Sequence, residues 1–365
     1  MFIFAPMKRK QIKNYLLIGF SILVQTVTAQ LAPVQHPSNT QTAQQGVAEE
    51  GLVKWMTYEE AAEKQKTVPR PIIMDFYTDW CGWCKQMIKT TYSDPNLASY
   101  INTYFYPVKF DAEGKDTVEY LGKKYFPTSA APRTVHPLAA KLLQNKLMYP
   151  TTLFLNGFDQ TKNEYKLSML ASGYLETTKI EPILIFTLEN AFRNSSYDDF
   201  NIGYQKAFYD SSTIEKAKLL KWLTPKEVFT ADMKLGKKKI IFFGNNDWCN
   251  SCKVERRASF ADSVNLEYIS QKFDLVEFDP NIKDTLFYNK QTLTNPATQQ
   301  IPYHSLAFTL CHGSLTFPTL VIMNENNEVV DAIPGYINAG FLNQISHFYG
   351  DDVYKTKSWQ DFTKK

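Results

Sequence analysis

The sequence predicts an α/β protein made of two copies of one domain, each with a mixed central sheet flanked by helices. Two observations carry this prediction. The chain aligns with itself at an offset of 168 residues, so that Trp80-Cys81 falls on Trp248-Cys249 and Pro150-Thr151 on Pro318-Thr319. Each copy also has the same order of expected elements: strand, helix, strand, helix, strand, strand, helix. A repeat of domain length indicates two domains rather than a solenoid of short units.

Local signals justify the elements in chain order. A threonine followed three residues later by a glutamate is a capping box, which predicts helix starts at Thr57 and Thr224. Apolar runs with strand character follow, and each leads directly into a C-x-x-C motif at the start of a helix. The expected strands are 71–77, 106–111 and 151–155 in the first copy, and 239–243, 273–279 and 319–323 in the second.

Helices and a hairpin strand complete each copy. The hairpin strands are expected to end at Gly173-Tyr174 and Gly335-Tyr336. Further helices are expected at about 136–147 and 178–193, and at 304–313 and 338–348. We therefore place the first domain at 51–208, a joint at 209–219 and the second domain at 220–365.

The N-terminus has the pattern of an export signal. A basic segment at 8–13 precedes an apolar segment at 15–24, which is too short for a comfortable membrane span. Small residues at Val27 and Ala29 predict cleavage after Ala29, giving a signal peptide at 1–29, with an uncleaved anchor as the alternative. Residues 30–50 are rich in Gln, Thr, Ser and Pro and are expected to be a disordered leader. We expect a periplasmic or secreted protein without stable membrane insertion after cleavage.

Composition excludes several classes of protein. With 44% hydrophobic and 14% aromatic residues, the 365-residue chain is neither disordered nor collagen-like. The net charge is only +3, and four of the positive charges lie within 8–13, so there is no electrostatic footprint for nucleic acid. The five cysteines form two C-x-x-C pairs with one left over, which points to redox chemistry rather than a disulfide scaffold.

The placement of each C-x-x-C motif predicts its chemistry. A motif between a strand and a helix puts the first sulfur, of Cys81 or Cys249, at the beginning of the helix. The free N–H groups there favour the thiolate, which is the nucleophile in disulfide exchange. The second cysteine, Cys84 or Cys252, lies three positions on and within reach to resolve a mixed disulfide.

The sequence resembles the thioredoxin superfamily. The first copy matches through Asp75-Phe76, 80–85 (WCGWCK) and Tyr149-Pro150-Thr151, and the second through 248–253 (WCNSCK) and Phe317-Pro318-Thr319. The resemblance implies two tandem thioredoxin-like domains, in which Cys81 and Cys249 attack while Cys84 and Cys252 resolve. It also implies that Pro150 and Pro318 are cis prolines facing the sulfurs. Asp75 matches a buried carboxylate that helps to move the proton of the resolving cysteine. The candidate substrate-binding residues are Trp80, Trp83, Tyr149, Pro150, Trp248, Phe317 and Pro318.

The sequence departs from the family pattern at three places. Trp83 replaces the proline that is common inside the motif, so a reduction potential cannot be carried over. Phe243 occupies the place of Asp75 in the second copy, which therefore lacks that proton acceptor. Asn250-Ser251 is an unusual filling for the second motif.

We expect an exported thiol–disulfide oxidoreductase that acts on protein disulfides, needs no cofactor, and exchanges electrons with a membrane donor or acceptor protein. A client-binding, chaperone-like module with weak or no exchange is the alternative. Periplasmic metal handling is a third option, although two motifs 168 residues apart do not have zinc-finger spacing, and we name no metal ligand. Cys311 aligns with Leu143 and is expected to be a small buried hydrophobe. His136 and His304 are expected to pack or to cap helices.

Overall fold

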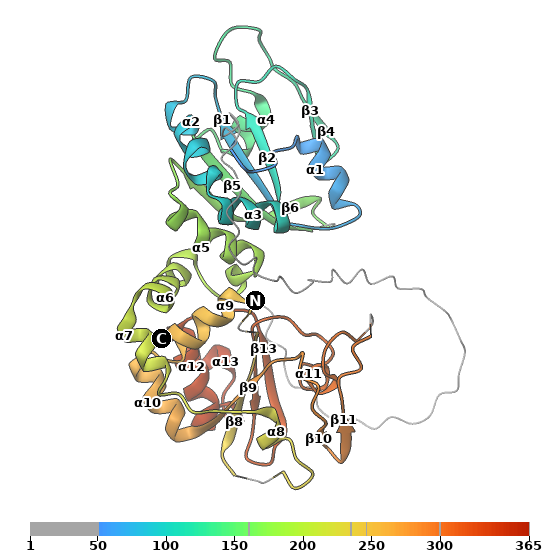
Figure 1. Ribbon diagram of the computed structural model, residues 1–365, viewed down its shortest axis with the longest axis vertical. Coiled ribbons are helices and arrows are strands. Elements are labelled where there is room, and N and C mark those ends of the chain that lie inside the picture. Colours follow the sequence, from blue (N-terminus) through green and yellow to red (C-terminus); the bar gives the residue numbers. More distant parts are fainter. Residues whose placement is uncertain (1–50, 160, 234–235, 246, 299–300, 365) are drawn as a thin grey trace, which may run out of the picture. The chain divides into compact units, whose positions relative to one another are not determined.

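The first copy of the repeat is built on a four-stranded sheet (Figure 1). One edge strand pairs in parallel with the central strand, which pairs antiparallel with the next strand, and a hairpin completes the sheet. Across the sheet the order is β2 (Tyr106–Asp111), β1 (Ile72–Tyr77), β5 (Thr151–Asp159) and β6 (Glu164–Ser172). This mixed sheet confirms the predicted fold class.

Helices bury both faces of this sheet because β1 is apolar on both sides. Ile72, Met74 and Phe76 pack in one cluster with α1 and α4, while Ile73 packs in another with α2, α3 and α5. The helices are α1 (Tyr58–Gln65), α2 (Gly82–Lys89), α3 (Pro95–Tyr104), α4 (Pro137–Leu142) and α5 (Thr177–Leu188).

Both capping boxes form as predicted. The Thr57 hydroxyl accepts from the Glu60 N–H at 3.2 Å, and the Glu60 carboxylate accepts from the Thr57 N–H at 2.9 Å. Thr224 and Glu227 make the same pair of contacts at the start of α8 (Pro225–Val228). Each box satisfies N–H groups that the first helical turn leaves free.

The second copy is built on a five-stranded sheet with an additional short edge strand. Its central strand again pairs in parallel with one neighbour and antiparallel with the other. The order is β13 (Val329–Pro334), β12 (Thr319–Met323), β8 (Lys238–Phe243), β9 (Phe273–Phe278) and β7 (Trp222–Leu223). The helices are α9 (Asn250–Val254), α10 (Ser263–Lys272), α11 (Ser305–Leu310), α12 (Ala339–Gly350) and α13 (Trp359–Thr363).

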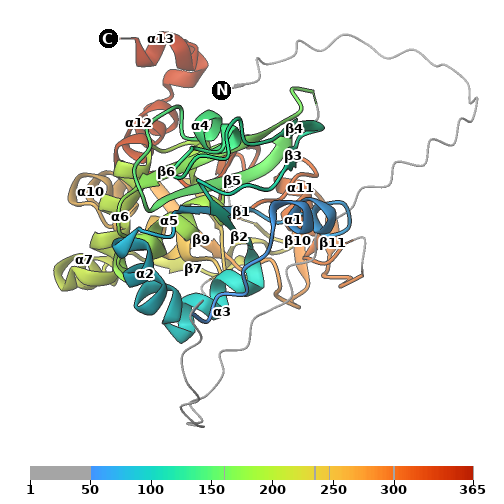
Figure 2. The same cartoon turned by 90° about the horizontal axis from the view of Figure 1, so that it is seen from above.

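The long segments between the second strand and the next helix each contain a small hairpin that the sequence did not predict. In the first copy β3 (Val118–Tyr120) pairs with β4 (Lys123–Tyr125), and α1 contacts β3 and lies beside this hairpin (Figures 1 and 2). In the second copy β10 (Leu286–Tyr288) pairs with β11 (Gln291–Leu293).

Two helices connect the copies. α6 (Tyr197–Tyr209) ends one residue beyond the expected first domain, and α7 (Ser211–Ala217) fills most of the expected joint. α6 packs both on α5 and on α9, so it contacts elements of both copies. The connection is therefore helical and packed rather than an extended linker.

The computed structural model describes residues 51–159, 161–233, 236–245, 247–298 and 301–364. The expected signal peptide and leader, 1–50, lie outside the described residues. All described residues fall within one compact unit. Across these described ranges, no helix has the length and apolar character needed to cross a membrane.

Candidate active sites

The first C-x-x-C pair lies where β1 gives way to α2. A tight turn links the two, in which the Cys81 N–H donates to the Thr78 carbonyl at 3.1 Å. Cys81 is the N-cap of α2 and is disulfide-bonded to Cys84, with their Cα atoms 5.3 Å apart. The Cys84 N–H donates to Cys81 Sγ at 3.1 Å. The first sulfur thus lies where helix N–H groups stabilise a thiolate.

Exposed aromatic side chains flank this pair. Trp80 is 55% exposed and Trp83 is 64% exposed, which is far above the usual exposure of a tryptophan. The Trp80 indole N–H donates to the Glu113 carboxylate at 3.1 Å, and the Trp83 ring lies 5.6 Å from that of Tyr174. Gly82, Trp83, Gln86 and Tyr174 line an open hollow beside the motif. Exposed aromatic side chains around an open hollow are typical of surfaces that bind peptides or other proteins.

The structure brings the distal proline segments to the tryptophans. The Tyr149–Pro150 and Phe317–Pro318 peptide bonds are both cis. The Tyr149 ring lies 6.1 Å from that of Trp80, and the Phe317 ring lies 5.2 Å from that of Trp248. Residues about 70 positions apart in the chain therefore meet in the same way in both copies.

Asp75 is a buried carboxyl on β1, six residues before Cys81. It accepts hydrogen bonds from the Thr152 hydroxyl at 3.0 Å and from the Tyr92 hydroxyl at 3.4 Å. Burial raises the pKa of Asp75 to about 7, against these hydrogen bonds, which lower it. A carboxyl with such a pKa can both accept and donate a proton near neutral pH.

The second C-x-x-C pair has the same backbone geometry. Cys249 is the N-cap of α9, and its Cα lies 5.2 Å from that of Cys252 in the disulfide. The Cys252 N–H donates to Cys249 Sγ at 3.2 Å. Phe243 replaces Asp75 here and is fully buried, as is Phe260 in the place of Tyr92.

The second site nevertheless contains a buried acid that the sequence analysis missed. Glu255 stands where the first copy has Met87, on the helical turn after Cys252, and is fully buried. Its Oε2 accepts from the Ile337 N–H at 2.9 Å, and its Oε1 has no hydrogen-bond partner. Burial raises the pKa of Glu255 well above its usual range. The buried carboxyl therefore lies on the strand in the first copy and on the helix in the second.

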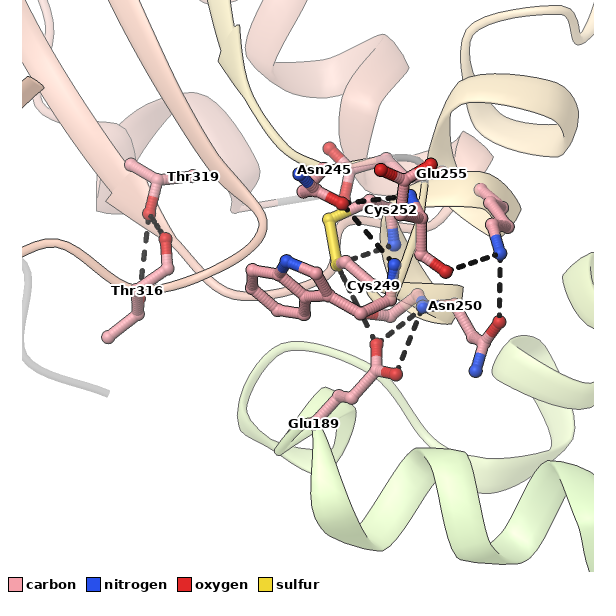
Figure 3. Close-up of a disulfide and its surroundings, with 12 residues drawn as sticks. Glu189, Asn245, Cys249, Asn250, Cys252, Glu255, Thr316 and Thr319 are labelled. Carbon is pink, nitrogen blue, oxygen red and sulfur yellow. Dashed lines mark hydrogen bonds between the residues drawn. A yellow bond between two sulfur atoms is a disulfide. The ribbon is translucent and has the colours of Figure 1, made fainter. Parts of the chain in front are cut away.

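A second carboxylate reaches this pair from outside the second copy. Glu189, the C-cap of α5, accepts from the Asn250 N–H at 3.0 Å and from the Ser251 N–H at 2.6 Å. Its Oε2 lies 3.7 Å from Cys249 Sγ. In Figure 3 Glu189 lies on one side of the disulfide and Glu255 on the other. Burial raises the pKa of Glu189, while hydrogen bonds from Ser251 and Asn250 oppose the rise.

The remaining candidates have structural roles. His136 and His304 are buried N-caps whose Nδ1 atoms accept from the Leu138 and Leu306 N–H groups. Cys311 is 4% exposed, and burial raises the pKa of its thiol to about 12. Within the described ranges, no group of three or more His, Cys, Asp or Glu side chains could hold a metal ion.

Comparisons with known proteins match both copies. A family called Thioredox_DsbH, described as "Protein of unknown function, DUF255", matches residues 41–170. A family called Thioredoxin_2, described as "Thioredoxin-like domain", matches residues 227–349. A search of curated proteins found no match.

Solved structures similar to this chain include a thioredoxin from Thermus thermophilus, with 16% identity, a TM-score of 0.27, and coverage of 36% of this chain and 84% of that one. A DsbH oxidoreductase has 19% identity, a TM-score of 0.24, and coverage of 38% and 87%. A thioredoxin-fold protein from Helicobacter pylori has 17% identity, a TM-score of 0.29, and coverage of 38% and 87%.

Proposed function

Because the chain belongs to the thioredoxin superfamily and has two thioredoxin-like regions, we propose that it is an exported thiol–disulfide oxidoreductase acting on protein disulfides. One observation carries the proposal: Cys81 and Cys84 are within disulfide distance at the start of α2, next to two exposed tryptophans. Thiolates at such helix starts are reactive nucleophiles.

The proposed reaction passes two electrons between substrate and protein. In the reducing direction, the Cys81 thiolate attacks one sulfur of a substrate disulfide and displaces the other as a thiolate, leaving a mixed disulfide. Cys84 then loses its proton to Asp75 and attacks Cys81 Sγ. The Cys81–Cys84 bond forms, and the second substrate sulfur leaves and is protonated. The oxidising direction is the reverse, and the reduction potential of the pair decides which direction prevails.

Side-chain positions support assigned roles around this pair. Asp75 would take the proton because burial brings its pKa to about 7. Trp80, Trp83 and Tyr149 would contact the substrate chain, since the two tryptophans are exposed and Tyr149 packs edge-on against Trp80. No cofactor is part of the proposal because the cysteines themselves carry the electrons.

Insulin reduction by dithiothreitol, followed as turbidity, tests the proposal. Cys81→Ser is expected to abolish most of the catalysed rate, while Cys311→Ser, at the buried free thiol, is the matched control and should leave the rate unchanged. Full activity in a chain that carries both Cys81→Ser and Cys249→Ser would refute the proposal.

The export signal and the electron partner are also proposals. N-terminal sequencing of the protein from cells should give Gln30 as the first residue after cleavage following Ala29. Titration of Cys81–Cys84 against glutathione, with alkylation and mass readout, gives its potential. A value below about −250 mV would call for a reducing membrane partner, and a value above about −180 mV for an oxidising one.

A client-binding module is the second candidate, and the exposed apolar surface of Trp80 and Trp83 favours it. If this surface binds unfolded clients, a chain with all four motif cysteines replaced by serine should still suppress aggregation of a model client. Loss of that suppression together with the cysteines would count against this candidate.

A further inference from the structure

The two copies differ in what covers the surface beside the C-x-x-C pair. In the first copy this surface is the open hollow, and Trp83 within it is 64% exposed. In the second copy Ser251 and Val254 are fully buried and Tyr336 is 1% exposed. The corresponding sets are Gly82, Trp83, Gln86 and Tyr174 in the first copy, and Asn250, Ser251, Val254 and Tyr336 in the second.

The chain's own helix α6 covers the second surface. Phe200 of α6 packs edge-on against Tyr336, with ring centroids 5.0 Å apart. Phe186 at the end of α5 and Tyr204 of α6 belong to the same apolar cluster, which also contains Val254, Ala258 and Tyr336. Burying aromatic side chains of this size strongly stabilises such a contact.

A glycine allows α6 to approach so closely. A Cβ atom added at Gly203 would lie 2.7 Å from the Tyr336 hydroxyl and 3.2 Å from Val254 Cγ1. The first distance is shorter than any ordinary contact, so a larger residue would push α6 away from this surface. A polar contact adds to this packing, since Asn194 Nδ2 donates to the Pro334 carbonyl at 2.8 Å.

Glu189 contacts the second C-x-x-C motif itself. Its carboxylate accepts from the N–H groups of Asn250 and Ser251 and lies 3.7 Å from Cys249 Sγ. These N–H groups belong to the first turn of α9, and the negative charge of Glu189 offsets the positive helix end that would otherwise favour a thiolate on Cys249. A negative charge at this distance also repels an incoming thiolate.

We propose that residues 189–207, called here the covering segment, occupy the surface that a substrate would use at the second site and hold the Cys249–Cys252 pair in a slowly exchanging state. This inference rests on the proposed function. It assigns the exchange with protein substrates to the first pair, and it makes Glu189 a positioning residue of the second.

The protected step is reduction of the second disulfide. A thiolate of dithiothreitol attacks Cys249 Sγ, the Cys249–Cys252 bond breaks, and Cys252 leaves as a thiolate that takes a proton. The second thiol of the reagent loses its proton and displaces Cys249, which is then protonated, and the reagent becomes a cyclic disulfide. The covering segment opposes the first attack by bulk and by the charge of Glu189.

The test uses the full chain with Cys81→Ser and Cys84→Ser, so that only the second pair reacts. Its reduction by dithiothreitol is followed by quenching with an alkylating agent and mass readout. Glu189→Gln keeps the size of the side chain but removes its charge, and we expect reduction about tenfold faster, as a charge at a helix end implies. Glu176→Gln, at the exposed other end of α5, is the matched control and should not change the rate.

Gly203→Val tests the bulk of the cover independently. It should displace α6 and also speed reduction, whereas Gln205→Val, at an exposed position of the same helix, should not. Circular dichroism checks that each variant is folded. If Gly203→Val fails to fold, the reduction rate of Glu189→Gln alone decides whether the proposal stands. Parent-like rates in both folded variants would overturn the proposal.

A reference measurement separates this inference from the proposed function. The first pair is measured in a chain with Cys249→Ser and Cys252→Ser. We expect its reduction to be at least tenfold faster than that of the covered pair, a difference of about 1.4 kcal/mol in activation free energy. Equal reduction rates for the two pairs would overturn only the proposal about the covering segment. A first pair that dithiothreitol does not reduce would overturn the proposed function.

Discussion

Asp75 makes the stability of the first domain depend on pH, and replacing it with asparagine should remove that dependence. The pKa of Asp75 rises from 3.8 to about 7 because the carboxyl is buried. Between these values the folded protein holds a proton that the unfolded chain has lost. The unfolding free energy therefore falls as the pH rises from about 4 to about 7. The raised pKa corresponds to a loss of about 4 kcal/mol over this range.

Asp75→Asn keeps the shape of the side chain and can still accept from the Thr152 hydroxyl. Its unfolding free energy should lack this slope, so its stability relative to the parent should improve by about 4 kcal/mol between pH 4 and pH 8. Urea unfolding across this range measures the difference, and hydrogen exchange of the β1 amides assigns the transition of the first domain. Asp79→Asn, at an exposed position, is the control and should show no such trend.

The result that would refute this reasoning is a stability difference between Asp75→Asn and the parent that stays constant within about 1 kcal/mol from pH 4 to pH 8. A second readout follows from the proposed proton transfer. Asp75→Asn should slow thiol exchange at neutral pH, because the resolving cysteine then loses its proton only to solvent.

Three further measurements test other parts of the structure. Thr57→Ala removes one capping box and should lower the unfolding free energy by about 1 kcal/mol in urea titration, whereas an unchanged value would mean that α1 does not depend on its cap. Cys311 should resist iodoacetamide in the folded protein and react only in urea, because burial raises its pKa to about 12; fast labelling without urea would contradict that burial. Trp80→Ala should alter stability by no more than about 0.5 kcal/mol, since the side chain is 55% exposed, but raise the KM for a protein substrate. An unchanged KM would remove Trp80 from the substrate surface.

The sequence was sufficient to predict the two sheets and the placement of both motifs. The strand at 71–77 is apolar except for Asp75, and the one at 239–243 is apolar except for its first residue. Each is followed closely by a C-x-x-C and a helix, so local patterns and the 168-residue offset agree. The small hairpins escaped prediction because strands of three residues, such as 118–120, show no usable period.

The charged groups around the second pair could not be predicted in the same way. Glu255 lies on a helix, where an acidic residue is usually solvated, and only its alignment with Met87 signals a buried position. Glu189 is 60 residues from Cys249 in sequence, and its contact depends on how α5 packs against α9. No local pattern encodes such a tertiary contact.

The apolar cluster around Tyr336 also determines how the chain can be divided. Phe186, Phe200 and Tyr204 complete a core whose other members are Val254, Ala258 and Tyr336. A fragment that begins at 220 would expose those last three side chains to water and should aggregate. A fragment that begins at 177 would include the aromatic side chains that cover them. The repeat unit in the sequence and the unit that can be isolated in solution are therefore different stretches of chain.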